Sequence, residues 1–216
     1  MTNRSGRTVR LISCVVLVAC SAWVGQANAD ALKSGDYAFS GGATCLVSPG
    51  GFDTDFTPIT PPGLVGVNSF SIEGVRTFNG DGTGKIVARI VNFGFVPDGG
   101  GLGTAHGRVN SSDVEADFTY TVAPDLTITV EHATVNLTFL RGTIPGASPG
   151  SSVPALGQTA TITGFPPLFG SISQDYRSLT LATSEPRVET VTTSTGNVTK
   201  RVCQWSTNLF ERKGRR

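Results

Sequence analysis

Few side chains in this sequence could do chemistry together, and four of them are candidate ligand-binding residues. Arg76, Arg89, Tyr120 and His132 lie in segments that otherwise alternate apolar and polar residues, as half-buried strands do. An arginine inside a barrel could orient the carboxylate of a ligand or stabilise a developing negative charge. His132 directly follows Glu131, but adjacent strand residues point to opposite faces, so these two side chains cannot form a catalytic dyad by themselves. The four residues are therefore predicted to bind a ligand, and no catalytic residue is predicted.

Other patterns that often mark an active site are incomplete in this sequence. The glycine-rich residues 99–103 precede a strand-like segment, whereas a dinucleotide-binding loop opens a helix. Residues 79–84 begin like a calcium loop but lack its terminal glutamate, so they indicate a turn. His106 and His132 have no carboxylate cluster near them in the sequence, and no Gly-x-Ser-x-Gly motif occurs. The sequence predicts no metal and no cofactor, and it leaves enzymatic activity uncertain while favouring a protein that is not an enzyme.

The first 29 residues follow the plan of a secretory signal peptide. Three arginines precede an apolar run over residues 11–24, and small residues end the segment at Ala29. Cleavage after Ala29 would leave Asp30 as the first residue of a periplasmic or extracellular protein. The alternative is that Leu-Val-Ala-Cys, ending at Cys20, acts as a lipobox, which would make the protein a lipoprotein anchored through Cys20.

Two cysteines, Cys45 and Cys203, follow the predicted signal peptide and lie near the two ends of the remaining chain. Two cysteines in an exported chain predict one disulfide bond. In the chain-entropy model, closing a loop of this length stabilises the fold by about 5 kcal/mol. Neither cysteine has a second cysteine or a histidine within a few residues, as a zinc site would require. The bridge is therefore expected to join the first strand to the last.

The mature chain divides into a weakly acidic domain and a basic end. Residues 30–210 contain 10 basic and 15 acidic side chains, whereas four of the last five residues are Lys or Arg. The acidic excess argues against a broad nucleic-acid-binding surface. No stretch after residue 30 approaches the roughly 18 apolar residues of a membrane-spanning helix, so no transmembrane segment is predicted in the mature chain. We predict one domain over residues 30–210 and a basic C-terminal tail over residues 211–216.

Every segment of the mature chain that looks ordered has the pattern of a β-strand. Runs rich in Thr, Val, Ile and Phe are bounded by Gly, Pro, Asn and Asp, and no amphipathic helix is evident. Asn-Gly and Asp-Gly within residues 79–84 predict a tight hairpin, and long Gly/Pro-rich loops are predicted at residues 48–63 and 142–157. The predicted fold class is all-β, a single antiparallel β-barrel of eight to ten strands closed by its terminal strands, with a β-sandwich as second choice. The expected strands cover residues 36–47, 68–78, 85–95, 114–122, 126–140, 158–165, 169–173, 178–183, 187–193 and 198–210.

The alternation also predicts which side chains point inward. In residues 114–122 the even positions are apolar, while Glu115, Asp117 and two threonines occupy the odd positions. In the next strand the apolar phase slips by one residue after His132, which predicts a β-bulge at that point. The expected core contains Phe70, Ile72, Val114, Ala116, Phe118, Tyr120, Leu126, Ile128 and Val130.

Several strand ends and turns resemble those of small exported bacterial proteins that have no assigned activity. These features are Gly35-Asp36-Tyr37 at the first strand, the hairpin over residues 78–84, Ser178-Leu179-Thr180-Leu181, and Arg201-Val202-Cys203 in the last strand. At the level of the fold, the chain is similar to the lipocalin-like and allene-oxide-cyclase-like barrels. That similarity implies an interior that holds an apolar ligand.

Together, these observations favour binding over catalysis. We expect an exported, non-catalytic β-barrel that binds a small apolar ligand in its interior or a partner at the rim formed by its long loops. One alternative is a cofactor-free isomerase or cyclase in which Arg76, Arg89 or His132 steers a reactive substrate. A further alternative is a structural role in the cell envelope or at the cell surface.

Overall fold

The structure is a computed structural model, and it describes most of the chain after the predicted signal peptide. The predicted signal peptide with Cys20, the glycines of residues 99–103, most of the loop over residues 142–157 and the last four residues lie outside the described residues. The described residues are 32, 34–59, 65–97, 105–143 and 155–212.

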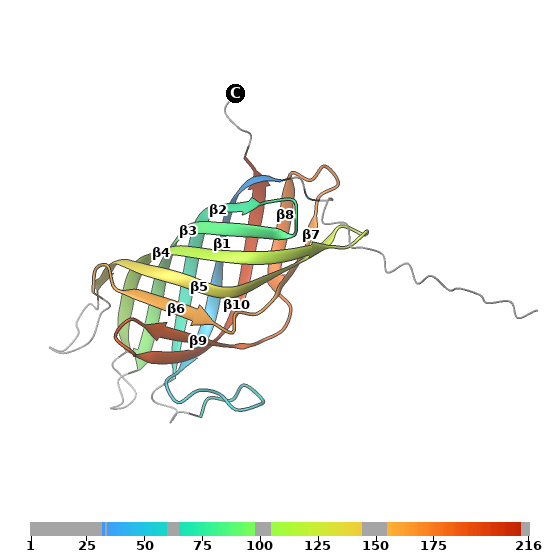
Figure 1. Cartoon of the computed structure of the whole chain (residues 1–216). Helices are drawn as coiled ribbons and strands as arrows, with labels where there is room; N and C mark the ends of the chain where they lie inside the picture. The colour runs from blue at the N-terminus through green and yellow to red at the C-terminus, as the bar shows by residue number, and fades with distance from the viewer. Residues whose placement is uncertain (1–31, 33, 60–64, 98–104, 144–154, 213–216) are drawn as a thin grey trace, which may run out of the picture.

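Ten antiparallel β-strands make up the fold, and no helix occurs in the described part of the chain. No helix able to span a membrane is therefore found among these residues. Figure 1 shows β3, β4 and β5 crossing the front of the molecule, with β1 and β10 running steeply behind them. The strands are β1 (Gly35–Ser48), β2 (Gly66–Phe78), β3 (Thr83–Pro97), β4 (Ala105–Val122), β5 (Thr127–Thr143), β6 (Thr159–Thr163), β7 (Leu168–Ile172), β8 (Ser178–Thr183), β9 (Val188–Thr193) and β10 (Val198–Glu211).

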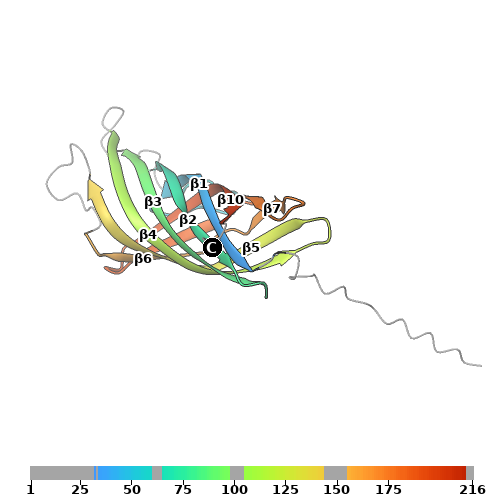
Figure 2. The ribbon, with the colours of Figure 1, turned by 90° about the horizontal axis from the view of Figure 1, so that it is seen from above.

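The strands form a closed ring rather than two separate sheets. The hydrogen-bonded order runs from β1 through β2, β3, β4, β5, β6 and β9 to β10, and β10 pairs with β1. This confirms the predicted all-β barrel and the predicted pairing of the terminal strands. Strands β7 and β8 form a second connection between β5 and β10, because β7 pairs with β5 and β8 pairs with β10. In Figure 2, β1, β2, β3 and β4 lie side by side as a curved wall.

The short strands are the halves of one long hairpin. Strands β6 and β7 pair with successive parts of β5, while β9 and β8 pair with successive parts of β10. The hairpin is interrupted between β6 and β7 at residues 164–167 and between β8 and β9 at residues 184–187. Prolines lie in both interruptions, and a proline has no N–H to donate to a strand ladder.

A disulfide bond joins the first strand to the last, as predicted. Cys45 on β1 lies directly opposite Cys203 on β10, and their Cα atoms are 4.0 Å apart. The seam between these strands extends over twelve residue pairs, from Tyr37 opposite Glu211 to Ser48 opposite Lys200. The covalent bond therefore holds the barrel closed at the seam that no hairpin connects.

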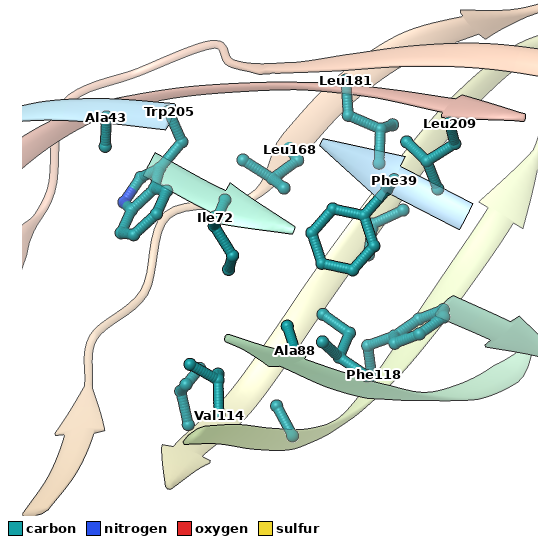
Figure 3. Packing of buried hydrophobic residues seen from close by; sticks show 14 of the residues in the cluster. Phe39, Ala43, Ile72, Ala88, Val114, Phe118, Leu168, Leu181, Trp205 and Leu209 are labelled. Carbon is teal, nitrogen blue, oxygen red and sulfur yellow. The ribbon is translucent and has the colours of Figure 1, made fainter. Parts of the chain in front are cut away.

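The core lies inside this ring. Eight of the nine predicted core residues are buried, including the alternating residues Val114, Ala116, Phe118 and Tyr120 of β4. Figure 3 shows side chains from several strands, among them Trp205, Ile72, Phe39 and Phe118, projecting into one interior. The interior is thus filled mainly by apolar side chains that alternate with outward polar residues along each strand.

The structure corrects two of the expected strand boundaries. Leu126 is not a strand residue but ends the turn before β5 with a φ of 67°, and it is only partly buried against the core. Asp125 stabilises this turn by accepting hydrogen bonds from the backbone N–H and the hydroxyl of Thr127. Strand β4 begins at Ala105 rather than at Val114, because the polar segment between them pairs with β3.

The two ends of the barrel differ in their connections. Following the antiparallel strand directions, strands β1, β3, β5 and β9 all end at one end of the barrel, which we call the loop rim. The short turns after β2, β4 and β7 meet at the other end. Gly80 and Gly82 have positive φ in the β2–β3 turn, as the Asn-Gly and Asp-Gly pairs predicted.

Candidate functional site

The barrel interior contains a small cavity with three polar side chains on its wall. Its volume is about 40 Å³, and most of its lining is apolar. Arg76, His132 and Thr207 are the polar residues that line it, and they come from β2, β5 and β10. The apolar lining consists of Ile72, Ile86, Ile90, Val114, Ala116, Val135, Leu137, Ile162, Phe165, Leu168 and Trp205.

Arg76 is held inside the barrel by the alternation of β2. It shares its face with Ile72 and Phe78, so the pleat directs its guanidinium inward. The guanidinium carbon lies 5.2 Å from the centre of the Phe39 ring, but Nε and Nη1 have no hydrogen-bond partner. Burial lowers the pKa of Arg76 to about 9. Arg76 is therefore a buried cation at neutral pH.

His132 points inward in the same alternation as Ile128 and Val130, and the bulge in β5 follows it. The register between β4 and β5 shifts between the pairs Ala116–Val135 and Phe118–His132, which confirms the predicted bulge. The ring of His132 packs 4.9 Å from Phe165, measured between centroids, and neither ring nitrogen has a hydrogen-bond partner. Burial and, secondly, the positive charge of Arg76 lower the pKa of His132 to about 3. His132 is thus neutral at pH 7, with one N–H donor and one acceptor nitrogen.

Thr207, on β10, is the third polar residue that lines the cavity. It lies opposite Gly41, where an added Cβ would come within 2.6 Å of the Thr207 Cγ2 atom. The absence of a side chain at Gly41 therefore lets Thr207 pack closely against β1. Its hydroxyl oxygen is buried and has no hydrogen-bond partner in the described structure.

A second polar cluster in the same interior contains its own ion pair, in which Nη2 of Arg201 lies 2.7 Å from the Glu189 carboxylate without forming a hydrogen bond. The buried carboxylate of Glu189 accepts a hydrogen bond of 2.7 Å from Nε of Arg201 and another of 2.7 Å from Nε1 of Trp205. The guanidinium of Arg201 also lies 4.9 Å from the centre of the Phe70 ring. Its charge is thus balanced by a carboxylate and covered by aromatic rings.

The structure places the remaining predicted ligand residues elsewhere. Arg89 is on the outer face, where its Nη2 lies 3.0 Å from the Asp113 carboxylate, because the inward positions of β3 are Ala88 and Ile90. Tyr120 is buried, yet it packs against Phe78 and is not among the residues that line the cavity. Burial raises the pKa of the Tyr120 hydroxyl. Arg76 and His132 are therefore the only predicted ligand residues that share this cavity.

The cavity lies beside the interruption of the long hairpin. Phe165, between β6 and β7, lines it and packs against both His132 and Trp205, at centroid distances of 4.9 and 5.2 Å. Across the second interruption, the backbone N–H of Trp205 donates to the hydroxyl of Thr183 instead of to a strand carbonyl. This part of the wall depends on side-chain contacts more than the uninterrupted ladders do.

A larger hollow of about 720 Å³ is lined mainly by residues of β3, β4 and β5, and the buried His132 lines it as well as the interior cavity. It is open to solvent, and its charged lining residues are Lys85, Asp117 and Glu131, all exposed. Exposed charges of both signs are common on a solvated surface. The interior cavity is the better candidate site because its polar groups are buried and lack partners.

Sequence reasoning missed Thr207, Glu189, Arg201 and Phe165. In β10 the buried residues Arg201, Cys203, Trp205, Thr207 and Leu209 occupy alternate positions. That alternation is visible in the sequence and could have marked Arg201 and Thr207 as inward-facing. His106, which was expected in a loop, is part of β4, but its side chain lies outside the described residues. No group of three His, Cys, Asp or Glu side chains that could hold a metal occurs among the described residues.

Comparisons with protein families, with curated proteins and with solved structures give no match. The class of the protein is therefore defined by its fold, which is an all-β antiparallel barrel closed by a terminal-strand seam and a Cys45–Cys203 disulfide.

Proposed function

We propose that this protein is a non-catalytic binding module whose small ligand occupies the interior cavity. The supporting observation is that Arg76, His132 and Thr207 line one apolar cavity and that each of them has a buried polar atom without a hydrogen-bond partner. Buried polar groups are nearly always hydrogen-bonded, and leaving one unpaired costs about 1–3 kcal/mol. A ligand with hydrogen-bonding groups would supply the missing partners.

The size of the cavity limits which of the small apolar ligands expected from the sequence can fit. The apolar lining suits a ligand with an apolar part, but about 40 Å³ is far below the roughly 300–1,000 Å³ of sites for drug-sized molecules. The proposed ligand is therefore a compact molecule of a few non-hydrogen atoms. A fatty or polycyclic ligand does not fit the cavity as it stands.

Binding is better supported than the isomerase or cyclase alternative. With its pKa lowered to about 3, His132 is a weak base, and it has no carboxylate bonded to it. The cavity also has room for fewer atoms than a chain that could cyclise. Arg76 and His132 would orient a bound group, which binding alone requires.

We also propose that the protein acts outside the cytoplasm. The disulfide between Cys45 and Cys203 is compatible with export, because such bonds persist in oxidising compartments. The mass of the native protein tests this part of the proposal. Asp30 as first residue would support cleavage by signal peptidase, a diacylated Cys20 would indicate a lipoprotein, and an intact Met1 would contradict both.

The binding proposal is tested by fragment screening with two-dimensional NMR on the full mature domain. The library contains neutral and charged compounds of about three to six non-hydrogen atoms. At least one compound should shift the resonances of Arg76, His132 and Thr207 together and saturably. Arg89→Met, a change on the outer face, is the matched control and should leave this response intact. A library that shifts none of the three residues would contradict the proposal.

A second candidate is a partner that binds at the loop rim. Nine large apolar side chains are exposed in the described residues, and six of them lie on strands or loops near the rim. Leu46 and Val67 are direct cross-strand neighbours, and Phe93 follows on the next strand. Grouped apolar exposure often marks an interaction surface. The six residues are Leu46, Ile59, Val67, Phe93, Leu156 and Val198.

The rim candidate is tested with the variant Leu46→Ser/Val67→Ser/Phe93→Ser. Surface substitutions usually change stability by about 0.5 kcal/mol or less each, so the variant should fold. We expect the unmodified protein to bind an apolar fluorescent dye and this variant to lose that binding. Equal dye binding by both proteins would remove this candidate without affecting the interior site.

A further inference from the structure

We propose that the interior cavity is a site for one small monovalent anion, either a short carboxylate such as formate or acetate or an inorganic anion such as nitrate or chloride. This inference rests on the proposed function, because it names the chemical class of the ligand for the same cavity. The space of about 40 Å³ corresponds to roughly three water molecules, which matches an ion of a few atoms.

The first argument is the uncompensated charge of Arg76. Its guanidinium is buried, and neither Nε nor Nη1 has a partner. Glu189 is the only acidic side chain buried among the described residues, and its carboxylate already bonds Arg201 and Trp205. An isolated buried charge is costly, and a counter-ion offsets that cost. A monovalent anion would balance the charge that the chain itself leaves open.

The second argument is the set of hydrogen-bond donors around the cavity. Arg76 offers guanidinium N–H groups, Thr207 offers a hydroxyl, and neutral His132 offers one ring N–H. Hydrogen bonds from such donors to an anion are stronger than those to a neutral acceptor. A cation would be repelled by Arg76. A water molecule would satisfy the hydrogen bonds but would leave the charge unbalanced.

The third argument is the apolar remainder of the lining. Isoleucines, valines and leucines from several strands make up most of the lining around the polar side chains. In such surroundings the attraction between Arg76 and an anion is screened much less than at the surface. The apolar wall also suits the methyl group of acetate. A carboxylate site should bind formate or acetate more tightly than chloride or nitrate, and a site for inorganic anions should show the reverse order.

The test is thermal unfolding of the mature domain in low-salt buffer with added sodium formate, acetate, nitrate or chloride. Sodium gluconate, whose anion is too large for the cavity, keeps the ionic strength constant. We expect Tm to rise saturably with at least one small anion, because a ligand that binds only the folded state stabilises it. Tighter binding of formate or acetate would identify a carboxylate site, and tighter binding of chloride or nitrate an inorganic one.

Two variants show whether the response comes from this cavity. Arg76→Met should abolish the saturable rise in Tm, and Thr207→Val should weaken the apparent affinity by about tenfold, as expected for one lost hydrogen bond to a charged group. Arg89→Met removes an arginine from the outer face and should keep the full response. An equal rise with gluconate, or an unchanged response in Arg76→Met, would overturn the proposal.

A measurement on the unmodified protein covers the case in which Arg76→Met does not fold. Carbon-13-labelled formate should show saturation transfer from the methyl groups of Ile72 and Ile86, and unlabelled chloride should compete with it. If neutral fragments bind in the cavity while no anion does, the anion proposal fails and the proposed function stands. If neither binds, both fail.

Discussion

Arg76 and Arg201 lie inside the same barrel with exposed fractions of 3% and 5%, yet their surroundings differ. Arg201 is bonded to a buried carboxylate, whereas Arg76 faces a cavity and lacks such a partner among the described residues. Burying a charge is tolerated when it is paired and hydrogen-bonded. The comparison shows that the charge of Arg201 is balanced within the chain, while the charge of Arg76 is not balanced by any described residue, and the proposed ligand site rests on this difference.

The strand register explains the difference. Arg201 lies directly opposite Glu189 in the pairing of β10 with β9, so the two side chains meet on the inner face. Arg76 lies between Tyr37 of β1 and Ile86 of β3, neither of which carries an acid. Cross-strand neighbours are the closest side chains in a sheet. The nearest neighbours of Arg76 therefore leave its charge unbalanced.

The largest expected effect is the loss of the paired arginine. Arg201→Met leaves Glu189 buried without its counter-charge, and breaking a buried pair in this way costs about 3–5 kcal/mol. Urea denaturation should show this loss in the free energy of unfolding. The double variant Arg201→Met/Glu189→Leu should recover much of it, because no charge is then stranded. A loss below about 1 kcal/mol in the single variant would mean that the pair does not stabilise the fold.

The next-largest effect is a loss of folding stability at acidic pH, which we expect because His132 is buried in its neutral form. The folded-state pKa of about 3 is below the usual value of 6.5, so the unfolded chain binds the extra proton between these values. This contribution to stability is fully present above pH 6.5 and is lost as the pH falls toward 3, by about 1.4 kcal/mol per pH unit. His132→Phe should reduce the slope of the free energy of unfolding between pH 6 and pH 4. An unchanged slope would show that His132 does not titrate as a buried neutral group.

A smaller effect is expected at Phe165, which lies between the two clusters. It contacts His132 on one side and Trp205 on the other. Phe165→Ala should cost about 1–3 kcal/mol, less than a fully buried phenylalanine, because Phe165 is only partly buried. It should also shift the fluorescence of Trp205 and speed the exchange of any cavity ligand. A Trp205 spectrum identical to that of the unmodified protein would contradict the packing.

The smallest effect is expected from Arg76→Met in a buffer without small anions. Replacing an unpaired buried charge with an apolar side chain of similar length removes a desolvation cost, so stability should stay within about 1 kcal/mol or rise. The matched comparison with Arg201→Met is made under the same conditions. Similar large losses in both variants would mean that Arg76 has a stabilising partner and that the two clusters do not differ.

Much of the fold could be predicted from local patterns. The alternation in β4, the Asn-Gly and Asp-Gly turn, and the phase slip at His132 all appear in the structure as expected. Each is a property of neighbouring residues, because the pleat repeats every two residues and a bulge shifts that repeat by one. The inward position of Arg76 follows from the same rule, since Arg76 occupies an even position of β2 and shares the inner face with Phe70, Ile72 and Phe78.

Other features depended on which strands meet. Arg89 was predicted to bind a ligand, but it lies on the outer face, and its partner Asp113 is set by the register of β3 on β4. One long hairpin is divided into β6, β7, β8 and β9, because its prolines lie where the chain would otherwise continue to pair with β5 and β10. The start of β4 at Ala105 likewise came from pairing, because the polar residues that follow do not alternate strongly by themselves.

The sequence by itself determined an all-β chain, the inward and outward sides of most strands, and a disulfide between the first strand and the last. Only the tertiary structure decided that Glu189 neutralises Arg201, that Arg76 is left without a carboxylate, and that His132 and Thr207 share its cavity. The physical reason is distance along the chain. Alternation is a local property of the backbone, whereas charge pairing and cavity shape arise where residues 76, 132 and 207 are brought together by strand register and barrel closure.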